Sequence, residues 1–422
     1  MRRTARFWRG PLQGLALPYL LVGGLCAQTS GALFEQVDGT VKVLSEITGW
    51  KVQRKVPSEI LSKTSFRSTM EAQMKESSAS KEVKAEELAL KLFGLVPPDF
   101  NLAQETVDLV TEQAAAFYDY HKKRLFVLDS TTDGTEQRVA LAHELAHALA
   151  DQQYNLGKFL NKGSPDDDAT TARQAVMEGQ ASWLSWAYIS TRNGGKPQVP
   201  EALLEQLTRA MGTSSGEFPV LAGEPLYIRE SLIFPYDQGL RFQDAVYRKL
   251  GNAAFDEVLQ RPPSSTQQIM HPEAYLAGVA PLKPDLPALP DYLGKDAGHY
   301  RLTLDGALGE FDFGIMLRQY AGERDGAEVA SHWRGGGFRL YQQKRSKTPV
   351  LAYAGVWDSP DSARAFFELY KNVLAGKWKK MEIASSKPEE VTGSGDSGRF
   401  VLRLTGATVQ CVEGLPSASV VR

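Results

Sequence analysis

The stretch Leu141-Ala142-His143-Glu144-Leu145-Ala146-His147-Ala148-Leu149-Ala150-Asp151 lies near the middle of this 422-residue chain and is rich in strong helix formers. Residues four apart share one face of a helix, so His143 and His147 point their imidazoles the same way. Two such nitrogens bind one Zn²⁺ at about 2.0 to 2.1 Å. Glu144 lies beside that position, where a carboxylate can take a proton from water. The spacing therefore predicts a zinc site on this helix, with Glu144 as the general base.

A catalytic zinc takes three protein ligands, so the third ligand must come from elsewhere in the chain. Glu178 is the candidate, because it lies in a predicted helix over 168–191 for which Asp168 is the expected cap. Its neighbours Gly179 and Ala181 are small and allow another helix to approach closely. We therefore expect His143, His147 and Glu178 to hold one Zn²⁺.

These residues resemble a known family. The run from His143 to Asp151 is similar to the active-site helix of thermolysin, and Glu178-Gly179 with Ala181 resembles the EGxA ligand helix of gluzincin peptidases. Phe234-Pro235-Tyr236-Asp237-Gln238-Gly239 resembles the Pro-Tyr-x-x-Gly helix start of zinc aminopeptidases. The resemblance implies that the Tyr236 hydroxyl stabilises an oxyanion, a role that suits a phenol donor beside developing negative charge.

The resemblance leaves some assignments open. Thermolysin-like enzymes brace a zinc histidine with an aspartate four residues after the ligand glutamate, where this chain has Ser182. Asp151, two turns after His143, is a candidate for a related structural role. His271, in a predicted loop over 263–273 that borders the cleft, is the second candidate for the oxyanion donor.

A substrate-docking edge is also implied by the resemblance. The predicted strand 124–129, or its partner at Phe117, would form the sheet edge along which an extended peptide pairs by its backbone. The Gly-x-Met-Glu-Asn run that binds a free substrate amine in the aminopeptidases does not occur in the sequence. We therefore expect a peptide or protein substrate and favour an endopeptidase.

The fold class expected from these patterns is α+β: a zincin-like, mainly helical catalytic domain with a small edge sheet, followed by a C-terminal α+β domain. Prolines at every third position from Pro281 to Pro290 favour an extended linker. The expected divisions are a signal peptide at 1–27, an N-terminal α/β region at 28–113, the metallopeptidase domain at 114–278, a Pro-rich linker at 279–295 and the C-terminal domain at 296–422. Helices are predicted over 81–95, 135–155, 168–191, 231–250 and from Pro360 onward, and strands over 114–118, 124–129, 350–357 and 399–404.

The first 27 residues combine four arginines with an apolar run and carry no acidic residue, which is typical of an export signal. Cleavage would remove Cys26, and Cys411 would then be the one remaining cysteine, without an intrachain disulfide. It would also change the net charge from −2 to about −6, which argues against nucleic acid as a partner. No stable membrane span is expected in the mature chain.

The combined expectation is an exported, periplasmic or extracellular, zinc-dependent metallopeptidase. Two alternatives remain open at this point. One is a non-catalytic protein of the cell envelope that uses a zincin fold to bind a peptide or partner. The other is a zinc hydrolase acting on a non-protein amide, such as peptidoglycan.

Overall fold

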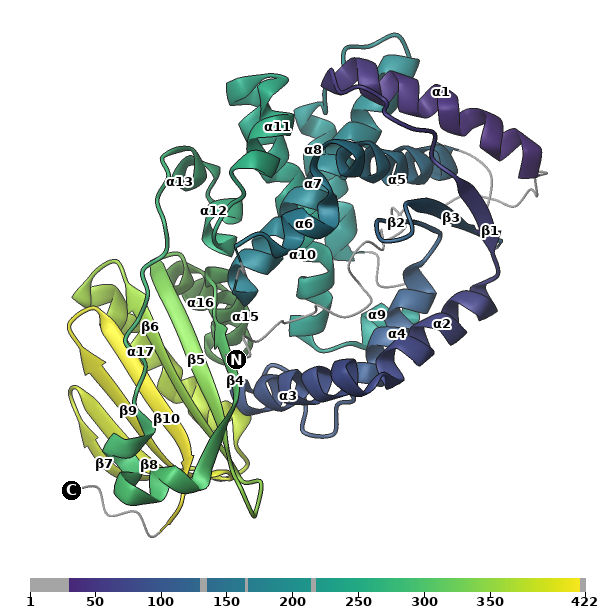
Figure 1. Ribbon diagram of the computed structural model, residues 1–422. Coiled ribbons are helices and arrows are strands. Elements are labelled where there is room, and N and C mark those ends of the chain that lie inside the picture. Colours follow the sequence, from purple (N-terminus) through teal and green to yellow (C-terminus); the bar gives the residue numbers. More distant parts are fainter. Residues whose placement is uncertain (1–29, 130–134, 164–165, 214–217, 418–422) are drawn as a thin grey trace.

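The structure is a computed structural model that describes residues 30–129, 135–163, 166–213 and 218–417; the expected signal peptide lies outside these residues. Helices make up most of the first two thirds of the chain, and the last third is built around an antiparallel sheet (Figure 1). The predicted α+β class is therefore confirmed. No helix within the described ranges is long and apolar enough to cross a membrane.

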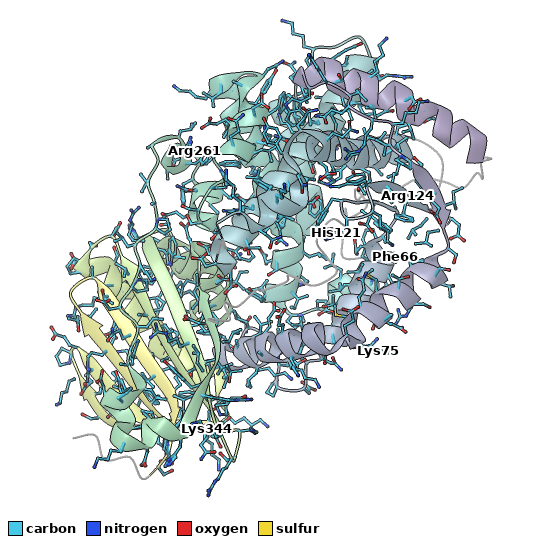
Figure 2. All side chains as sticks on the ribbon, in the orientation of Figure 1. Phe66, Lys75, His121, Arg124, Arg261 and Lys344 are labelled. Atoms are coloured by element: carbon cyan, nitrogen blue, oxygen red, sulfur yellow. The ribbon has the colours of Figure 1, made fainter. Side chains whose placement is uncertain are left out.

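The N-terminal region contains a three-stranded sheet and four helices. These elements are α1 (Ser30–Thr48), β1 (Ser58–Leu61), α2 (Lys63–Lys75), α3 (Ser77–Phe93), α4 (Leu102–Gln113), β2 (Ala116–Asp119) and β3 (Arg124–Leu128). The predicted strand pair is confirmed as β2 and β3, which pair antiparallel. Phe66 of α2 packs against Phe117 of β2 at a centroid distance of 5.3 Å, and this contact joins the helices to the sheet (Figure 2).

Strand β3 lies at the centre of the small sheet, in the order β1-β3-β2. The expectation that β3 could be the docking edge is wrong, because β1 pairs with it in parallel on the side away from β2. The sequence analysis missed β1, a short strand in which Ile60 is exposed. Strand β2, which carries Phe117, remains an edge strand.

Nine helices between 135 and 276 form the middle of the described chain. They are α5 (Thr135–Tyr154), α6 (Leu156–Asn161), α7 (Asp167–Arg192), α8 (Glu201–Thr213), α9 (Pro219–Gly223), α10 (Leu226–Leu250), α11 (Ala253–Gln260), α12 (Thr266–Met270) and α13 (Pro272–Leu276). The three long predicted helices are confirmed as α5, α7 and α10. The cap of α7 is Asp166, whose carboxylate accepts the Ala169 N–H at 2.9 Å. Asp168 was predicted for this role, but it accepts the Thr266 N–H instead.

Helix α10 differs from the predicted helix start. It begins at Leu226, so Pro235 lies well inside it. A proline inside a helix removes the hydrogen bond to the carbonyl four residues earlier and bends the helix. The helix continues through Pro235 because packing partners lie along both halves: α15 against the first and α7 against the second.

The predicted linker is packed against the C-terminal sheet. The linker is extended only as far as Ala288, where α14 (Leu289–Leu293) begins. The apolar residues of α14 cover one face of the sheet, which explains why a helix forms here. Leu282 donates its N–H to the carbonyl of Arg334 at 2.6 Å.

The remaining elements are the 3-10 helix η2 (Gly294–His299), β4 (Tyr300–Ala307), α15 (Glu310–Ala321), α16 (Glu323–Ala330), β5 (Trp333–Gln343), β6 (Pro349–Trp357), α17 (Pro360–Lys377), β7 (Glu382–Lys387), β8 (Glu390–Gly395), β9 (Gly398–Thr405) and β10 (Thr408–Leu415).

The seven strands run in the order β4-β5-β6-β10-β9-β8-β7, and every neighbouring pair is antiparallel. Helices α15 and α17 cover the face opposite α14, where Phe313 and Phe366 pack edge to face at 5.3 Å. Helix α17 begins as predicted, with the Ser359 hydroxyl accepting the Ser362 N–H.

The C-terminal domain shares its core with the rest of the molecule. Phe93, at the end of α3, is fully buried and packs edge to face on Phe338 of β5 at 5.3 Å. Lys377 of α17 donates to the carbonyl of Leu92 at 2.9 Å, which satisfies an orphan group at the end of α3. The large sheet and the helical part are therefore joined by one continuous hydrophobic core.

A partly buried carboxyl at this junction makes stability depend on pH. Asp312 of α15 accepts the Tyr227 hydroxyl at 3.0 Å and the Gly309 N–H at 2.8 Å, yet burial raises its pKa from 3.8 to about 6. The folded state therefore binds more protons than the unfolded state between these two values. The free energy of unfolding should fall by about 2 to 3 kcal/mol as pH rises from about 4 to about 6.

Asp312→Asn should remove this part of the pH dependence. Urea unfolding at pH 4 to 7, with EDTA present so that metal loss does not contribute, measures it. Asp361→Asn, at an exposed position in the first turn of α17, is the matched control and should keep the wild-type slope. Equal slopes for Asp312→Asn and the wild type would contradict the expectation.

Candidate metal centre

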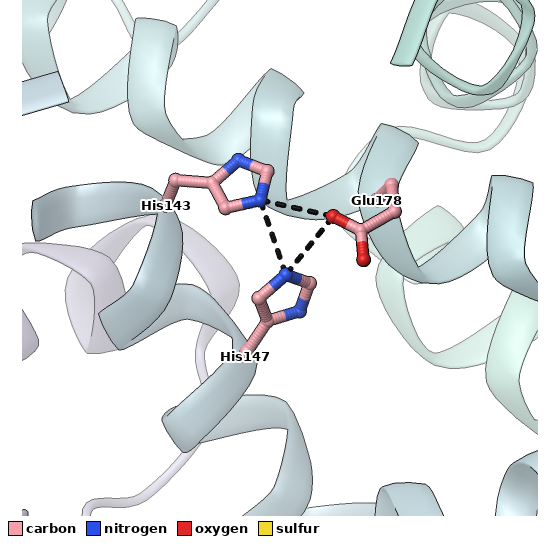
Figure 3. A group of neighbouring side chains, drawn as sticks. All are labelled: His143, His147 and Glu178. Carbon is pink, nitrogen blue, oxygen red and sulfur yellow. Dashed lines mark hydrogen bonds and ion pairs between the residues drawn. The ribbon is translucent and has the colours of Figure 1, made fainter. Parts of the chain in front are cut away.

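Three buried side chains converge on one point between α5 and α7 (Figure 3). The Nε2 atoms of His143 and His147 lie 3.1 Å apart, and Oε2 of Glu178 lies 3.1 Å from the first and 3.2 Å from the second. The two histidines come from successive turns of α5, as their spacing predicts, and the glutamate comes from α7. The structure therefore brings together all three residues that the sequence analysis named as ligands.

The donor set fits a metal ion. Ligand atoms of a tetrahedral zinc with bonds of about 2.0 to 2.1 Å lie about 3.3 Å from one another. The three distances here, 3.1 to 3.2 Å, are close to that value. Two imidazole nitrogens and a carboxylate oxygen are also ligand types that zinc accepts. Among the described residues this is the one group of three or more His, Cys, Asp or Glu side chains close enough to hold a metal.

Close contact between α7 and α10 places Glu178 beside α5. A Cβ atom on Gly179 would lie 2.1 Å from the carbonyl oxygen of Gly239, and a Cβ on Gly239 would lie 2.2 Å from the carbonyl oxygen of Ala175. Both glycines are therefore required for the two backbones to touch. Gly179, which follows Glu178, and Gly239, the last residue of the Pro-Tyr-x-x-Gly run, are therefore packing partners.

The electrostatics of the group favour a bound cation. Burial raises the pKa of a carboxylate, but His147 and hydrogen bonds from both imidazoles outweigh burial and lower the pKa of Glu178 to about 2. Burial lowers the pKa of His143. Burial alone would also lower the pKa of His147, but the negative charge of Glu178 raises it. The raised pKa of His147 favours a proton on this imidazole beside the ionised Glu178. A metal ion would displace that proton, because imidazole binds a metal in its neutral form.

Glu144 lies outside the ligand triangle and is fully buried. Its Oε2 accepts the backbone N–H of Tyr118 in strand β2 at 2.6 Å, and its Oε1 has no hydrogen-bond partner among the described residues. Burial raises the pKa of Glu144 to about 8 in the metal-free group, and a cation held by the neighbouring triangle would lower it again and favour the ionised base. One oxygen is therefore fixed by the sheet edge, and the other is available to a reacting water.

Tyr236 of α10 packs on the ligand group. Its ring lies 6.0 Å from that of His143, centroid to centroid, with the two planes 28° apart. The structure therefore places this predicted oxyanion donor beside the ligand His143.

The second candidate donor, His271, has another partner. Its Nε2 lies 2.8 Å from the buried Glu310 of α15, which raises the pKa of the imidazole. The predicted loop around it is wrong, since α12 occupies its middle and α13 begins at Pro272, and Gln267 of α12 donates to the carbonyl of Trp333 in the C-terminal domain. We therefore assign His271 to the junction with that domain.

Asp151 has a structural role at the small sheet. Its carboxylate accepts the Tyr118 hydroxyl at 2.9 Å, the Lys123 ammonium at 2.8 Å and the Leu156 N–H at 2.9 Å. These contacts tie α5 to β2 and to the turn before β3. The hydroxyl of Ser182, at the position of the thermolysin-like aspartate, is buried without a hydrogen-bond partner in the described part of the chain.

Two contributors to the site were missed from the sequence. The N–H of Tyr118 belongs to the backbone, so no residue type signals it. Gly239 carried a signal, because a glycine inside a helix weakens the helix and is kept where another backbone must approach. Its partner Gly179 was noted as small, but the pairing of the two was not predicted.

Residues 301–422 match a family described as a domain of unknown function, DUF8575. The match begins within β4 and covers the C-terminal sheet with its helices, and it does not include the ligand group. No curated protein and no solved structure matches the chain.

Gly239→Ala should separate α7 from α10, because its Cβ would lie 2.2 Å from a backbone oxygen that cannot rotate away. We expect a loss of about 3 kcal/mol in the free energy of unfolding, as for other overpacked sites. Metal affinity should fall as well, since Glu178 moves with α7. Urea unfolding and zinc titration measure the two effects. Gly223→Ala, where a Cβ meets nothing within 4 Å, is the control; equal stability of the two variants would contradict the packing argument.

Glu178→Ala should lose the metal. Changes to outer-shell partners weaken metal binding by about 10- to 100-fold, so removal of a ligand should weaken it by more than about 100-fold. Metal analysis of the purified wild type and variant, with Glu201→Ala at an exposed position as control, measures the difference. Equal zinc in the wild type and Glu178→Ala would exclude Glu178 as a ligand.

Proposed function

We propose that this protein is a zinc-dependent metallopeptidase that cleaves internal peptide bonds. The observation that carries the proposal is the triangle of His143 Nε2, His147 Nε2 and Glu178 Oε2. The carboxylate of Glu144 lies next to this triangle but is not part of it. A purely structural metal site would have four protein ligands and would not need an adjacent buried carboxylate.

The residues around the triangle supply the parts that peptide hydrolysis needs. His143, His147 and Glu178 would hold a zinc ion, which would polarise a carbonyl and make water acidic enough to lose a proton near neutral pH. Glu144 takes that proton through its Oε1 and delivers it to the leaving amine, while the Tyr118 N–H holds Oε2 in place. Tyr236 donates its hydroxyl to the oxyanion that develops on the substrate carbonyl.

The edge strand β2 is the proposed docking site for the peptide backbone. Strand β3 pairs with β2 on one side, and Tyr118 directs its N–H to the other side, towards Glu144. Backbone groups alternate in direction along a strand, so Ala116 presents its N–H and C=O on the same side as Tyr118. A substrate paired with Ala116 would run past the ligand group. An extended peptide therefore suits the site better than a compact small amide.

The proposed setting is outside the cytoplasm, and the basic and apolar residues 1–27 support it. A single remaining cysteine, Cys411, is buried in the C-terminal sheet. A chain that relies on packing and not on disulfides is compatible with export, provided that its core is large.

Glu144→Gln should keep its zinc and lose its activity. The amide retains a carbonyl oxygen for the Tyr118 N–H but cannot accept a proton, so hydrolysis should fall by at least about 100-fold. The measurement is cleavage of an unfolded protein and of a peptide library, with zinc content determined on the same samples. Glu112→Gln, a change at a carboxylate that binds the N-terminus of α9, is the control.

Turnover by Glu144→Gln at the wild-type rate would refute the assignment of the general base. A wild-type protein that binds zinc and cleaves peptidoglycan but no peptide would refute the substrate class. Zinc binding without hydrolysis of either would favour a binding protein.

A further inference from the structure

The first half of α10 rests on α15 of the C-terminal domain. Phe311 packs on Phe234 at 4.4 Å and on Tyr227 at 6.2 Å, centroid to centroid. Tyr227 also donates its hydroxyl to Asp312 at 3.0 Å, and Arg318 pairs with Glu230 at 3.3 Å. The three α10 residues in these contacts recur at intervals of three and four and therefore share one face of the helix.

Tyr236 lies on the opposite face of the same helix. It lies two positions after Phe234, which is a rotation of about 200° around the axis. Phe311 therefore supports the back of the turn whose front carries the tyrosine beside His143. Phe311, Phe234 and Tyr236 are all buried, so this contact is solid packing with little water.

Pro235 weakens α10 next to Tyr236, so the helix depends there on its contacts with α15. The proline has no N–H to bond the carbonyl of Ser231, so the helix is held less firmly by its own hydrogen bonds at the turn before Tyr236. The second half of α10 is fixed on α7 through Gly239. The first half is fixed on α15 through Phe311. The angle between the halves, and with it the position of the Tyr236 hydroxyl, depends on both contacts.

We propose that Phe311 is a positioning residue: through Phe234 and the helical turn that contains Pro235, it sets the place of Tyr236 at the candidate metal centre. The C-terminal domain then contributes to the reaction without touching the substrate. The inference rests on the proposed function, because Tyr236 matters only where an oxyanion forms. It gives the sequence that matches DUF8575 a role in this chain, as the support for one side of the active site.

A double-mutant cycle separates this role from simple stabilisation. Phe311→Leu should lower kcat by about tenfold and leave KM within about twofold, since a displacement near 1 Å at a catalytic group has effects of this size or larger. Zinc content should stay at the wild-type level. In the Tyr236→Phe background the same change should lower kcat by less than about twofold, because the hydroxyl that Phe311 positions is then absent. Phe311→Met is the second variant if the first folds poorly.

Phe366→Leu is the matched control, because Phe366 is fully buried in the core of the C-terminal sheet and packs on Phe313, Trp357 and Tyr370. It should destabilise the domain without a specific loss of kcat. Amide hydrogen exchange gives a readout that needs no substrate: Phe311→Leu should accelerate exchange in the turns on either side of Pro235, and Phe366→Leu should not.

Equal losses of kcat in the wild-type and Tyr236→Phe backgrounds would overturn the proposal, as would unchanged exchange around Pro235. A wild-type protein without hydrolytic activity would refute the proposed function. The exchange experiment would still decide whether Phe311 holds this turn of α10.

Discussion

Helices α7 and α10 touch backbone to backbone at Gly179 and Gly239, and the rest of the candidate site depends on this contact. Glu178 precedes the first glycine, and Tyr236 lies one turn before the second. Any side chain at either glycine would collide with a carbonyl of the facing helix, about 2 Å from its Cβ. The contact thus fixes two helices at once, and α5 needs only to present its two histidines to complete the group.

Burial of His143, His147 and Glu178 is hard to explain by a contribution to the stability of the fold. Removing a carboxylate and two imidazoles from water is unfavourable, and buried ion pairs are often no better than apolar packing of the same volume. His143, His147 and Glu178 nevertheless lie within a helical core, where leucines and alanines on other faces of α5 supply the packing. A function for the group explains the arrangement better than its contribution to folding does. The buried Oε1 of Glu144, without a partner in the described chain, leads to the same conclusion.

The sequence was most informative where one helix carries the pattern by itself. The histidine spacing of α5 follows from 3.6 residues per turn, so this helix and its two candidate ligands could be predicted. Contacts between distant segments could not be derived in this way. Asp168 was read as a local cap, but it binds Thr266 almost a hundred residues later. The helix around Pro235 is predicted only from residue 231, because nothing local shows that α15 packs against the preceding turn, which begins at Leu226.

The linker was mispredicted for a related reason. Prolines at every third position from Pro281 to Pro290 do favour extended chain, but their composition does not show whether that chain lies in solvent or on a sheet. The family match begins at residue 301 and marks a segment that recurs as a sequence unit. It does not show whether that segment packs as a separate domain. An independent domain would show a polar surface towards its neighbours. Here Phe93 enters the sheet core, and Phe311 enters the helical core. The C-terminal domain is therefore part of the structure that holds the candidate site, and its folding and the geometry of that site are coupled.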